Sequence, residues 1–165
     1  AGFLFKIFVV AAAFLVITQF TKQPRQAQAF AESMSTIDNG VLGTHTSIDS
    51  LGTGLWVVSY YDETNGDLKF AKTIDAGATY TFATVDSAGD VGQFTSIDAI
   101  GSAIYISYYD ATNTSLKVAR STDSGGTWTL LTVDNTASVG RYTSIEAVGT
   151  DVIMISYYDT DGGDL

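Results

Sequence analysis

The stretch TSIDSLGTGLWVVSYYD at residues 46–62 occurs three times in the chain with small changes. It returns as TSIDAIGSAIYISYYD at 95–110 and as TSIEAVGTDVIMISYYD at 143–159. A second stretch, DLKFAKTIDAGATYTFATVD at 67–86, returns as SLKVARSTDSGGTWTLLTVD at 115–134. The first tyrosine of the YY doublet stands at 60, 108 and 157, so the period is about 48 residues. Self-similarity at such a period indicates a repeat architecture.

Each repeat contains the pattern of four short β-strands. In the first repeat we expect strands over 46–51, 55–61, 67–73 and 79–85, separated by turns rich in Gly, Asp and Asn. The second strand is a nearly unbroken apolar run, which favours burial of both of its faces. Four strands repeated at this spacing predict an all-β fold of propeller blades. A β-sandwich also has short strands, but it would not require the self-similarity.

The turn between the third and fourth strands carries its own motif. TIDAGATY at 73–80 and STDSGGTW at 121–128 share the pattern Ser/Thr-x-Asp-x-Gly-x-Thr-aromatic. We expect the aspartates to accept backbone N–H groups within the turn and the glycines to take angles that a Cβ resists. The threonine after each glycine is expected to begin the next strand, with the aromatic residue packed beside the turn. This predicted structural set is Thr73, Asp75, Gly77, Thr79, Tyr80, Ser121, Asp123, Gly125, Thr127 and Trp128.

On these two motifs and the SYYD repeat, residues 41–165 resemble the Asp-box (bacterial neuraminidase, or BNR) repeat propellers, which include sialidases and many non-enzymatic relatives. The resemblance implies about two and a half blades, at 41–90, 91–138 and, in part, 139–165. A closed propeller has roughly four blades or more. We therefore expect the 165 residues to belong to a longer polypeptide, or the missing strands to come from other subunits. In a short chain, the strand over 152–158 would have an unpaired edge.

The segment before the first repeat resembles a displaced fourth strand. FAESMSTID at 30–38 aligns with ATYTFATVD at 78–86, so that Asp38 matches Asp86. Propellers commonly close their ring with an N-terminal strand that completes the last blade. Residues 26–40 are therefore predicted to be a linker with a ring-closing strand.

The N-terminus is strongly apolar. GFLFKIFVVAAAFLVITQF at 2–20 is interrupted only by Lys6 and by the mildly polar Thr18 and Gln19. About 18 to 20 residues at 1.5 Å each span a bilayer core, so residues 1–25 are predicted to form a transmembrane helix that anchors the chain. The alternative is a signal peptide cleaved after AQA at 27–29. Lys22 and Arg25 lie before that site, where signal peptides are usually uncharged, which favours retention.

Composition excludes several classes of protein. The formal net charge is −10 and the eight Lys and Arg residues are scattered, so we expect no nucleic-acid partner. The absence of cysteine excludes disulfides, thiolate metal sites and cysteine nucleophiles. A chain with 45% hydrophobic and 16% charged residues suits a packed domain rather than a disordered one.

The resemblance to sialidases implies a set of catalytic groups against which the chain can be compared. A sialidase would need three clustered arginines, a tyrosine with a glutamate partner and an acidic proton donor. The only arginines are Arg25, Arg120 and Arg141, and their positions do not predict a cluster. We therefore predict no catalytic, cofactor-binding or metal-binding residues and no cofactor in this segment.

Two polar signals have structural interpretations. His45 aligns with Phe94 and Tyr142, which indicates a semi-buried aromatic position rather than a metal ligand or general base. DTDGGD at 159–164 is similar to an acidic calcium loop, but it aligns with the hairpin DETNGD at 62–67.

The remaining candidates concern ligand binding. Trp56 and Trp128 are residue types that stack on sugars, yet each fits a packing position in the repeat. A binding surface would be encoded where matching repeats differ, namely at Thr44, Gln93 and Arg141 and in the turns at 63–66 and 111–114.

The leading functional hypothesis is a non-catalytic β-propeller on the extracytoplasmic side of a membrane, periplasmic or extracellular. It would be tethered by its N-terminal helix and act as a binding or accessory subunit with other protein subunits. One alternative is a sialidase-like glycoside hydrolase whose catalytic residues lie beyond residue 165. Another is a secreted propeller that binds carbohydrate.

Overall fold

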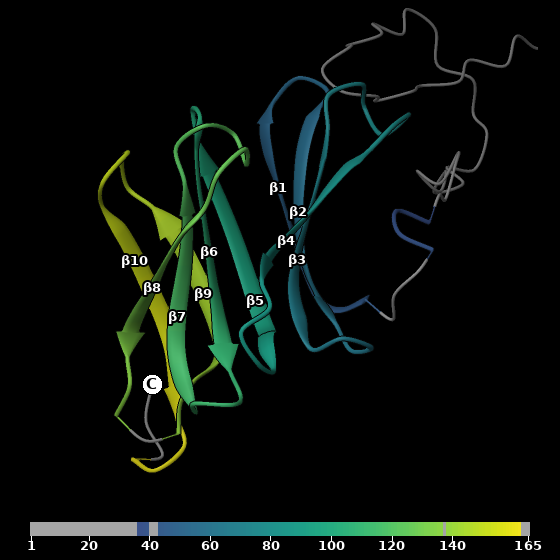
Figure 1. Cartoon of the computed structure of the whole chain (residues 1–165). Helices are drawn as coiled ribbons and strands as arrows, with labels where there is room; N and C mark the ends of the chain where they lie inside the picture. Colours follow the sequence, from purple (N-terminus) through teal and green to yellow (C-terminus); the bar gives the residue numbers. More distant parts are fainter. Residues whose placement is uncertain (1–35, 40–42, 137, 163–165) are drawn as a thin grey trace, which may run out of the picture. The chain divides into compact units, whose positions relative to one another are not determined.

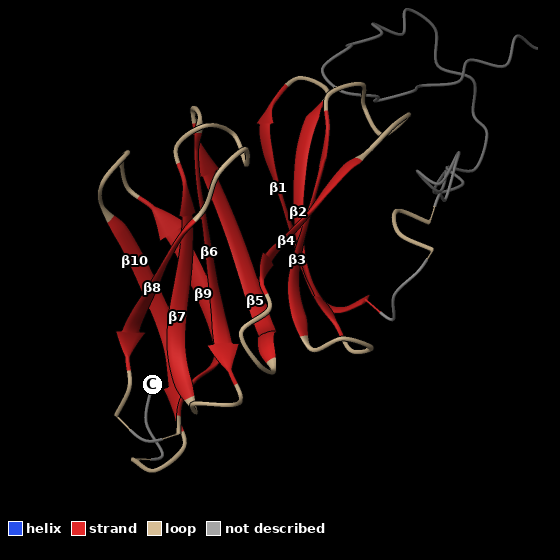
Figure 2. Cartoon of the chain, in the orientation of Figure 1, coloured by secondary structure: helices blue, strands red, loops and turns tan. Residues whose placement is uncertain are grey.

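A computed structural model of the chain describes residues 36–39, 43–136 and 138–162 (Figure 1). These residues form ten β-strands and no helix (Figure 2), which confirms the all-β prediction. The predicted anchor at 1–25 and most of the predicted linker at 26–40 lie outside the described residues. Within the described ranges, no helix has the length and hydrophobicity needed to cross a bilayer.

The strands form three antiparallel sheets that follow the repeats. Sheet 1 contains β1 (Gly43–Gly52), β2 (Leu55–Asp62), β3 (Asp67–Thr73) and β4 (Thr81–Asp86) in sequence order. Sheet 2 contains β5 (Val91–Ile100), β6 (Ala103–Asp110), β7 (Ser115–Ser121) and β8 (Thr129–Asp134) in the same order. Sheet 3 contains β9 (Val139–Ala147) and β10 (Ile153–Asp159). Every pairing joins strands that are consecutive in the chain, so each sheet is a simple meander (Figure 1).

The predicted second strand is the most buried of each complete sheet. All eight residues of β6 are buried, and so are the last six of β2. This confirms that the apolar run is covered on both faces, because the two sets of alternating side chains pack against different neighbours.

One strand begins later than the sequence predicts. β4 starts at Thr81 rather than at Thr79. The backbone N–H and the hydroxyl of Thr79 both donate to the carboxylate of Asp75, at 2.9 and 2.6 Å, so Thr79 still belongs to the turn.

The hydrophobic core lies between consecutive sheets. Between sheets 1 and 2 it includes Val57, Phe70, Val85, Ile97 and Tyr108. Between sheets 2 and 3 it includes Tyr105, Val118, Ile145, Ile153 and Ile155. The first strands of the three sheets are also in contact, β1 with β5 and β5 with β9. Sheet 2 therefore buries one face against sheet 1 and the other against sheet 3.

Where the chain enters sheets 2 and 3, its backbone passes close to the backbone of the preceding sheet. Gly92 has a φ of +108°, and a Cβ there would lie 2.7 Å from the Cα of Leu68. Gly140 repeats this with a φ of +102° and 2.7 Å to the Cα of Leu116. Both positions require glycine because they combine a left-handed backbone with contact to the preceding sheet.

Candidate binding surface and the contacts between sheets

The aspartates of the two repeated turns hold the turns themselves. The Asp75 carboxylate accepts the Thr73 hydroxyl at 2.7 Å in addition to the two groups of Thr79. In the second turn, Asp123 accepts the Ser121 hydroxyl at 2.7 Å and the N–H and hydroxyl of Thr127 at 2.8 Å each. These hydrogen bonds, chiefly those from Thr79 to Asp75 and from Thr127 to Asp123, lower the pKa of both carboxyls to about 2.

The second of these turns also packs on the preceding sheet. A Cβ at Gly125 would lie 2.5 Å from Cε1 of Phe70 on β3. The Trp128 ring meets Phe70 edge-on, with 5.1 Å between centroids. Lys72 of β3 donates to the carbonyl oxygen of Ser124 at 2.8 Å. The turn at 121–128 thus helps to join sheet 2 to sheet 1.

A tyrosine–aspartate pair recurs where each sheet meets the segment before it. The hydroxyl of Tyr108 donates to Asp86 at 2.7 Å, and Tyr157 donates to Asp134 at the same distance. Tyr60 makes an identical contact with Asp38, also at 2.7 Å. Asp38 therefore occupies the position relative to sheet 1 that Asp86 occupies relative to sheet 2. The described residues 36–39 form no strand, and the rest of the predicted ring-closing strand lies outside the described residues.

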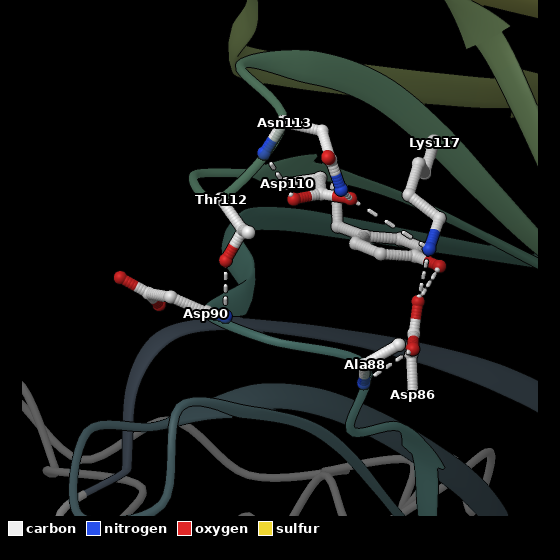
Figure 3. Close-up of polar contacts among 8 residues, drawn as sticks. Asp86, Ala88, Asp90, Asp110, Thr112, Asn113 and Lys117 are labelled. Carbon is white, nitrogen blue, oxygen red and sulfur yellow. Dashed lines mark hydrogen bonds and ion pairs between the residues drawn. The ribbon is translucent and has the colours of Figure 1, made fainter.

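The Asp86 carboxylate lies in a buried polar network (Figure 3). Lys117 Nζ lies 2.5 Å from Asp86 Oδ2 and 3.8 Å from Asp110 Oδ2. Burial alone would raise the pKa of Asp86, but hydrogen bonds from Lys117 and Tyr108 outweigh it and hold the pKa below its usual value. Burial, together with the Asp86 contact, raises the pKa of the Tyr108 phenol. Such a paired carboxylate is a structural ion pair between sheets rather than a general base.

The recurring aspartate after each tyrosine doublet closes the next turn. Asp62 accepts the backbone N–H of Thr64 at 2.9 Å, and Asp110 accepts that of Asn113 at 2.9 Å (Figure 3). Asp159 accepts the N–H groups of Asp161 and Gly162, each at 3.0 Å. In the DTDGGD stretch, the Asp159 carboxylate thus accepts backbone N–H groups of the following turn, as Asp62 and Asp110 do in the other hairpins. This is an Asx-turn arrangement.

The TSID stretch links the first strands of neighbouring sheets. Ser47 Oγ and Asp49 Oδ2 accept the backbone N–H groups of Ile97 and Ala99, at 3.1 and 2.8 Å. The next junction repeats the pattern, with Ser96 and Asp98 accepting the N–H groups of Ile145 and Ala147. Sequence reasoning missed this role, although the conserved spacing of Ser and Asp within the repeat was a usable signal.

An ordered row of aromatic side chains marks the start of the first strands. His45 and Phe94 lie 4.5 Å apart between ring centroids, and Phe94 and Tyr142 are also 4.5 Å apart. We call these three residues the aromatic row. Each also lies beside the second tyrosine of its own sheet, at 6.1 to 6.3 Å between centroids, namely Tyr61, Tyr109 and Tyr158.

The aromatic row is presented by β-bulges with an unusual backbone. In β1, Thr44 pairs with Tyr61 and Ser47 with Ser59, so two residues oppose one. The φ angles of His45, Phe94 and Tyr142 are +49°, +54° and +53°. A left-handed backbone is rare for bulky residues, and bulges redirect side chains. The predicted semi-buried position is correct for Phe94 but wrong for His45 and Tyr142, which are exposed at the two ends of the row.

The positions that vary between repeats lie beside the aromatic row. Thr44 donates to Glu63 at 3.2 Å, and Gln93 donates to both oxygens of Asp90 at 3.1 to 3.2 Å. Arg141 instead lies over the Tyr109 ring, 5.2 Å from its centroid. The structure thus brings the predicted variable positions, the turn at 63–66 and the aromatic row to one end of the sheets.

Other candidates are placed elsewhere. Arg120 bonds to Asp151 at 2.6 Å, in the β9–β10 hairpin, whereas Arg141 lies at the opposite end of β9. The two described arginines therefore do not converge. Trp128 is partly buried against Phe70, as expected, whereas Trp56 is 40% exposed on β2.

Comparisons with known proteins add no relative. The chain matches no protein-family model, and no curated protein shows significant similarity to it.

Proposed function

We propose that the chain is a non-catalytic binding module of Asp-box propeller type, which contacts a protein partner through the aromatic row. The observation that carries the proposal is Tyr142, which is 66% exposed in a left-handed bulge at the end of the row. Backbone strain of this kind costs about 1–3 kcal/mol per residue and persists where the surrounding structure enforces it, often at ligand-binding positions.

The arrangement of the sheets supports the propeller assignment. Successive meanders pack face to face, with their first strands in contact and the repeated turns at equivalent places. This is how neighbouring blades are related in a propeller.

The use of the acidic groups supports a non-catalytic role. The carboxylates that recur in the repeats each bind a turn, as Asp75 and Asp110 do, or a neighbouring sheet, as Asp86 and Asp98 do. A group engaged in this way in every repeat serves folding, whereas catalytic groups in a propeller would be unique to one blade.

The geometry of the aromatic row favours a protein over a sugar. Neighbouring rings are tilted by 54–60° and lie 4.5 Å apart, so they cover part of each other's faces. A sugar stacks on an open, flat ring face, and in the row only the two end rings, His45 and Tyr142, are exposed. Exposed tyrosine next to arginine is instead typical of the residues that dominate protein interfaces. Carbohydrate binding at Tyr142 is the second candidate.

A photoreactive phenylalanine analogue at position 142 of the full chain, in its native membranes, tests the protein-partner proposal. We expect a cross-link to one protein, and we expect Arg141→Ala to abolish it. The same analogue at Ile74, which is 69% exposed in the turn at 73–80, is the matched control. Identical cross-linking from both positions would contradict the proposal. Binding on a glycan array that is lost in Tyr142→Ala would favour the sugar instead.

The membrane tether is a separate part of the proposal and rests on the apolar sequence of residues 1–25. Deleting these residues is expected to release the β-sheet unit from membranes in soluble form. Continued sedimentation with membranes, after a carbonate wash, would exclude the tether.

A further inference from the structure

A lysine amine and a carboxyl from different sheets are held in contact between sheets 1 and 2. Nζ of Lys117, on β7, lies 2.5 Å from Oδ2 of Asp86, at the end of β4 (Figure 3). The two side chains are only 12% and 1% exposed. A second carboxylate, that of Asp110 at the end of β6, has its Oδ2 3.8 Å from the same Nζ and is 3% exposed. An amine, an acyl group and a proton acceptor therefore meet at one buried point.

The surroundings of the amine are apolar. The ring centroid of Tyr108 lies 5.6 Å from Nζ of Lys117. Tyr108 belongs to the same hydrophobic core as Leu68 and Val91, and all three side chains are fully buried. Burial penalises charged forms, so moving the ammonium proton to a carboxylate costs less here than in water. The ion pair is still the major form, since hydrogen bonds hold the pKa of Asp86 below its usual value.

Both oxygens of the Asp86 carboxyl have hydrogen-bond donors. Oδ1 accepts the backbone N–H of Ala88 at 3.0 Å, and Oδ2 accepts the hydroxyl of Tyr108 at 2.7 Å. Donors fixed in place at a carboxyl group stabilise the negative charge that its oxygens gain when a nucleophile adds to the carbon. Oδ1 is thus placed to remain as an amide oxygen, and Oδ2 to leave.

The second carboxylate is held in position by its own turn. Asp110 accepts the backbone N–H of Asn113 and its side-chain Nδ2, each at 2.9 Å (Figure 3). These two contacts fix the carboxylate beside Lys117. A carboxylate held next to an ammonium group can accept its proton and pass it on.

We propose that Lys117 and Asp86 form an intramolecular isopeptide bond, which links sheets 1 and 2 covalently. Asp110 takes a proton from the ammonium group, and the neutral amine attacks Cγ of Asp86. The C–N bond forms and the bond from Cγ to Oδ2 breaks. Oδ2 leaves as water with two protons that came from Nζ, one of them through Asp110, which returns to its ionised form. One ammonium and one carboxylate thus become one amide and one water, so no oxidant or other reactant is needed. Fixed contact between the reacting groups supplies the driving geometry.

The test is the mass of the full chain, purified in mild detergent. The folded protein should be lighter than the value calculated for its sequence by one water, about 18 Da. Trypsin should not cleave after Lys117, and one peptide should contain the segments around residues 86 and 117 joined together. Lys117→Arg keeps a cation beside Asp86 but cannot form this bond, so its mass should equal the calculated value. Asp110→Asn should form the bond more slowly in a time course after refolding.

Lys72→Arg is the matched control. Lys72 also joins sheets 1 and 2, but its acceptor is the backbone carbonyl oxygen of Ser124, at 2.8 Å, rather than a carboxyl group. This variant should lose one water as the unmodified chain does.

Three results would overturn the proposal. The first is the full calculated mass for the unmodified, folded chain. The second is a loss of water that persists in Lys117→Arg, because an aspartyl succinimide, for example at Asp161–Gly162, loses the same mass. Hydroxylamine opens a succinimide and leaves an isopeptide bond intact, so loss of the mass difference under hydroxylamine is the third. If Lys117→Arg does not fold, the joined peptide of the unmodified chain decides, and its absence would exclude the bond.

Discussion

The hydroxyl of Tyr108 on β6 lies 2.7 Å from Oδ2 of Asp86 at the end of β4, and both residues are buried between sheets 1 and 2. The same pair, at the same distance, joins Tyr60 to Asp38 and Tyr157 to Asp134. The contact is thus a property of the repeat, and it can be removed at one junction while the others serve as controls.

Replacing Tyr108 by phenylalanine should destabilise the fold by about 1–3 kcal/mol, because it removes a donor from a buried carboxylate. Asp86 keeps its Lys117 contact, so the protein should still fold. Urea denaturation measures the change in free energy. Tyr157→Phe is the control at a more exposed junction, and it should cost no more than about 1 kcal/mol. Equal losses in the two variants would argue against burial as the cause.

The turn aspartates should titrate far below ordinary carboxyls. Asp75 and Asp123 have pKa values of about 2 in the folded chain, against about 3.9 when unfolded. Because the folded pKa is the lower one, their stabilisation is complete above about pH 4 and is lost as the pH falls towards 2. Carbon-detected NMR of the carboxyl groups measures both midpoints.

Thr79→Val provides the test of the cause. It removes the hydroxyl that donates to Asp75 at 2.6 Å and should raise the Asp75 midpoint. Asp123 is an internal control, and its midpoint should not change. A normal midpoint for both aspartates in the unmodified chain would show that the turns do not form as described.

Gly92→Ala should be destabilising by at least about 1–3 kcal/mol, since the residue has a left-handed φ and its Cβ would strike the backbone of Leu68. Gly149→Ala, where the added Cβ has no atom within 4 Å apart from those of the residue itself and its two chain neighbours, should be close to neutral. Thermal unfolding of the two variants makes the comparison. A tolerated alanine at position 92 would mean that sheets 1 and 2 are further apart than the structure shows.

Val85 and Val133 occupy the same position in β4 and β8, but they are 8% and 51% exposed. Val85→Ala should cost about 2 kcal/mol, from roughly 0.8 kcal/mol per buried methylene-sized group plus the cavity left behind. Val133→Ala should cost much less. Denaturant unfolding at one pH gives the loss in unfolding free energy for both variants. A larger loss for Val133→Ala than for Val85→Ala would contradict the burial of Val85.

The strands were predictable because the repeat shows them several times. The apolar run of β2 and β6 indicated burial on both faces. Asp38 aligns with Asp86, and both accept a tyrosine hydroxyl, a contact that the sequence analysis did not predict. The start of β4 was not predictable to the residue, since it depends on hydrogen bonds from Thr79 to Asp75.

The aromatic row could be located in the sequence but not interpreted from it. The alignment of His45, Phe94 and Tyr142 was visible, whereas the bulge that turns them outward depends on how β1, β5 and β9 pair with their neighbours. The repeated spacing of Ser47 and Asp49 could mark these residues, but their partners in β5 depend on packing between sheets and could not be identified from the sequence.

The paired contacts between sheets also bear on how such a chain changes length during evolution. Each full repeat carries a tyrosine that reaches back to the preceding unit and an aspartate that receives the tyrosine of the following one, as Tyr108 and Asp134 do in sheet 2. Duplication or loss of one whole repeat of about 48 residues therefore leaves every internal pair matched. A gene segment of that length can be copied without any compensating substitution, whereas a partial copy would leave a buried carboxylate unpaired.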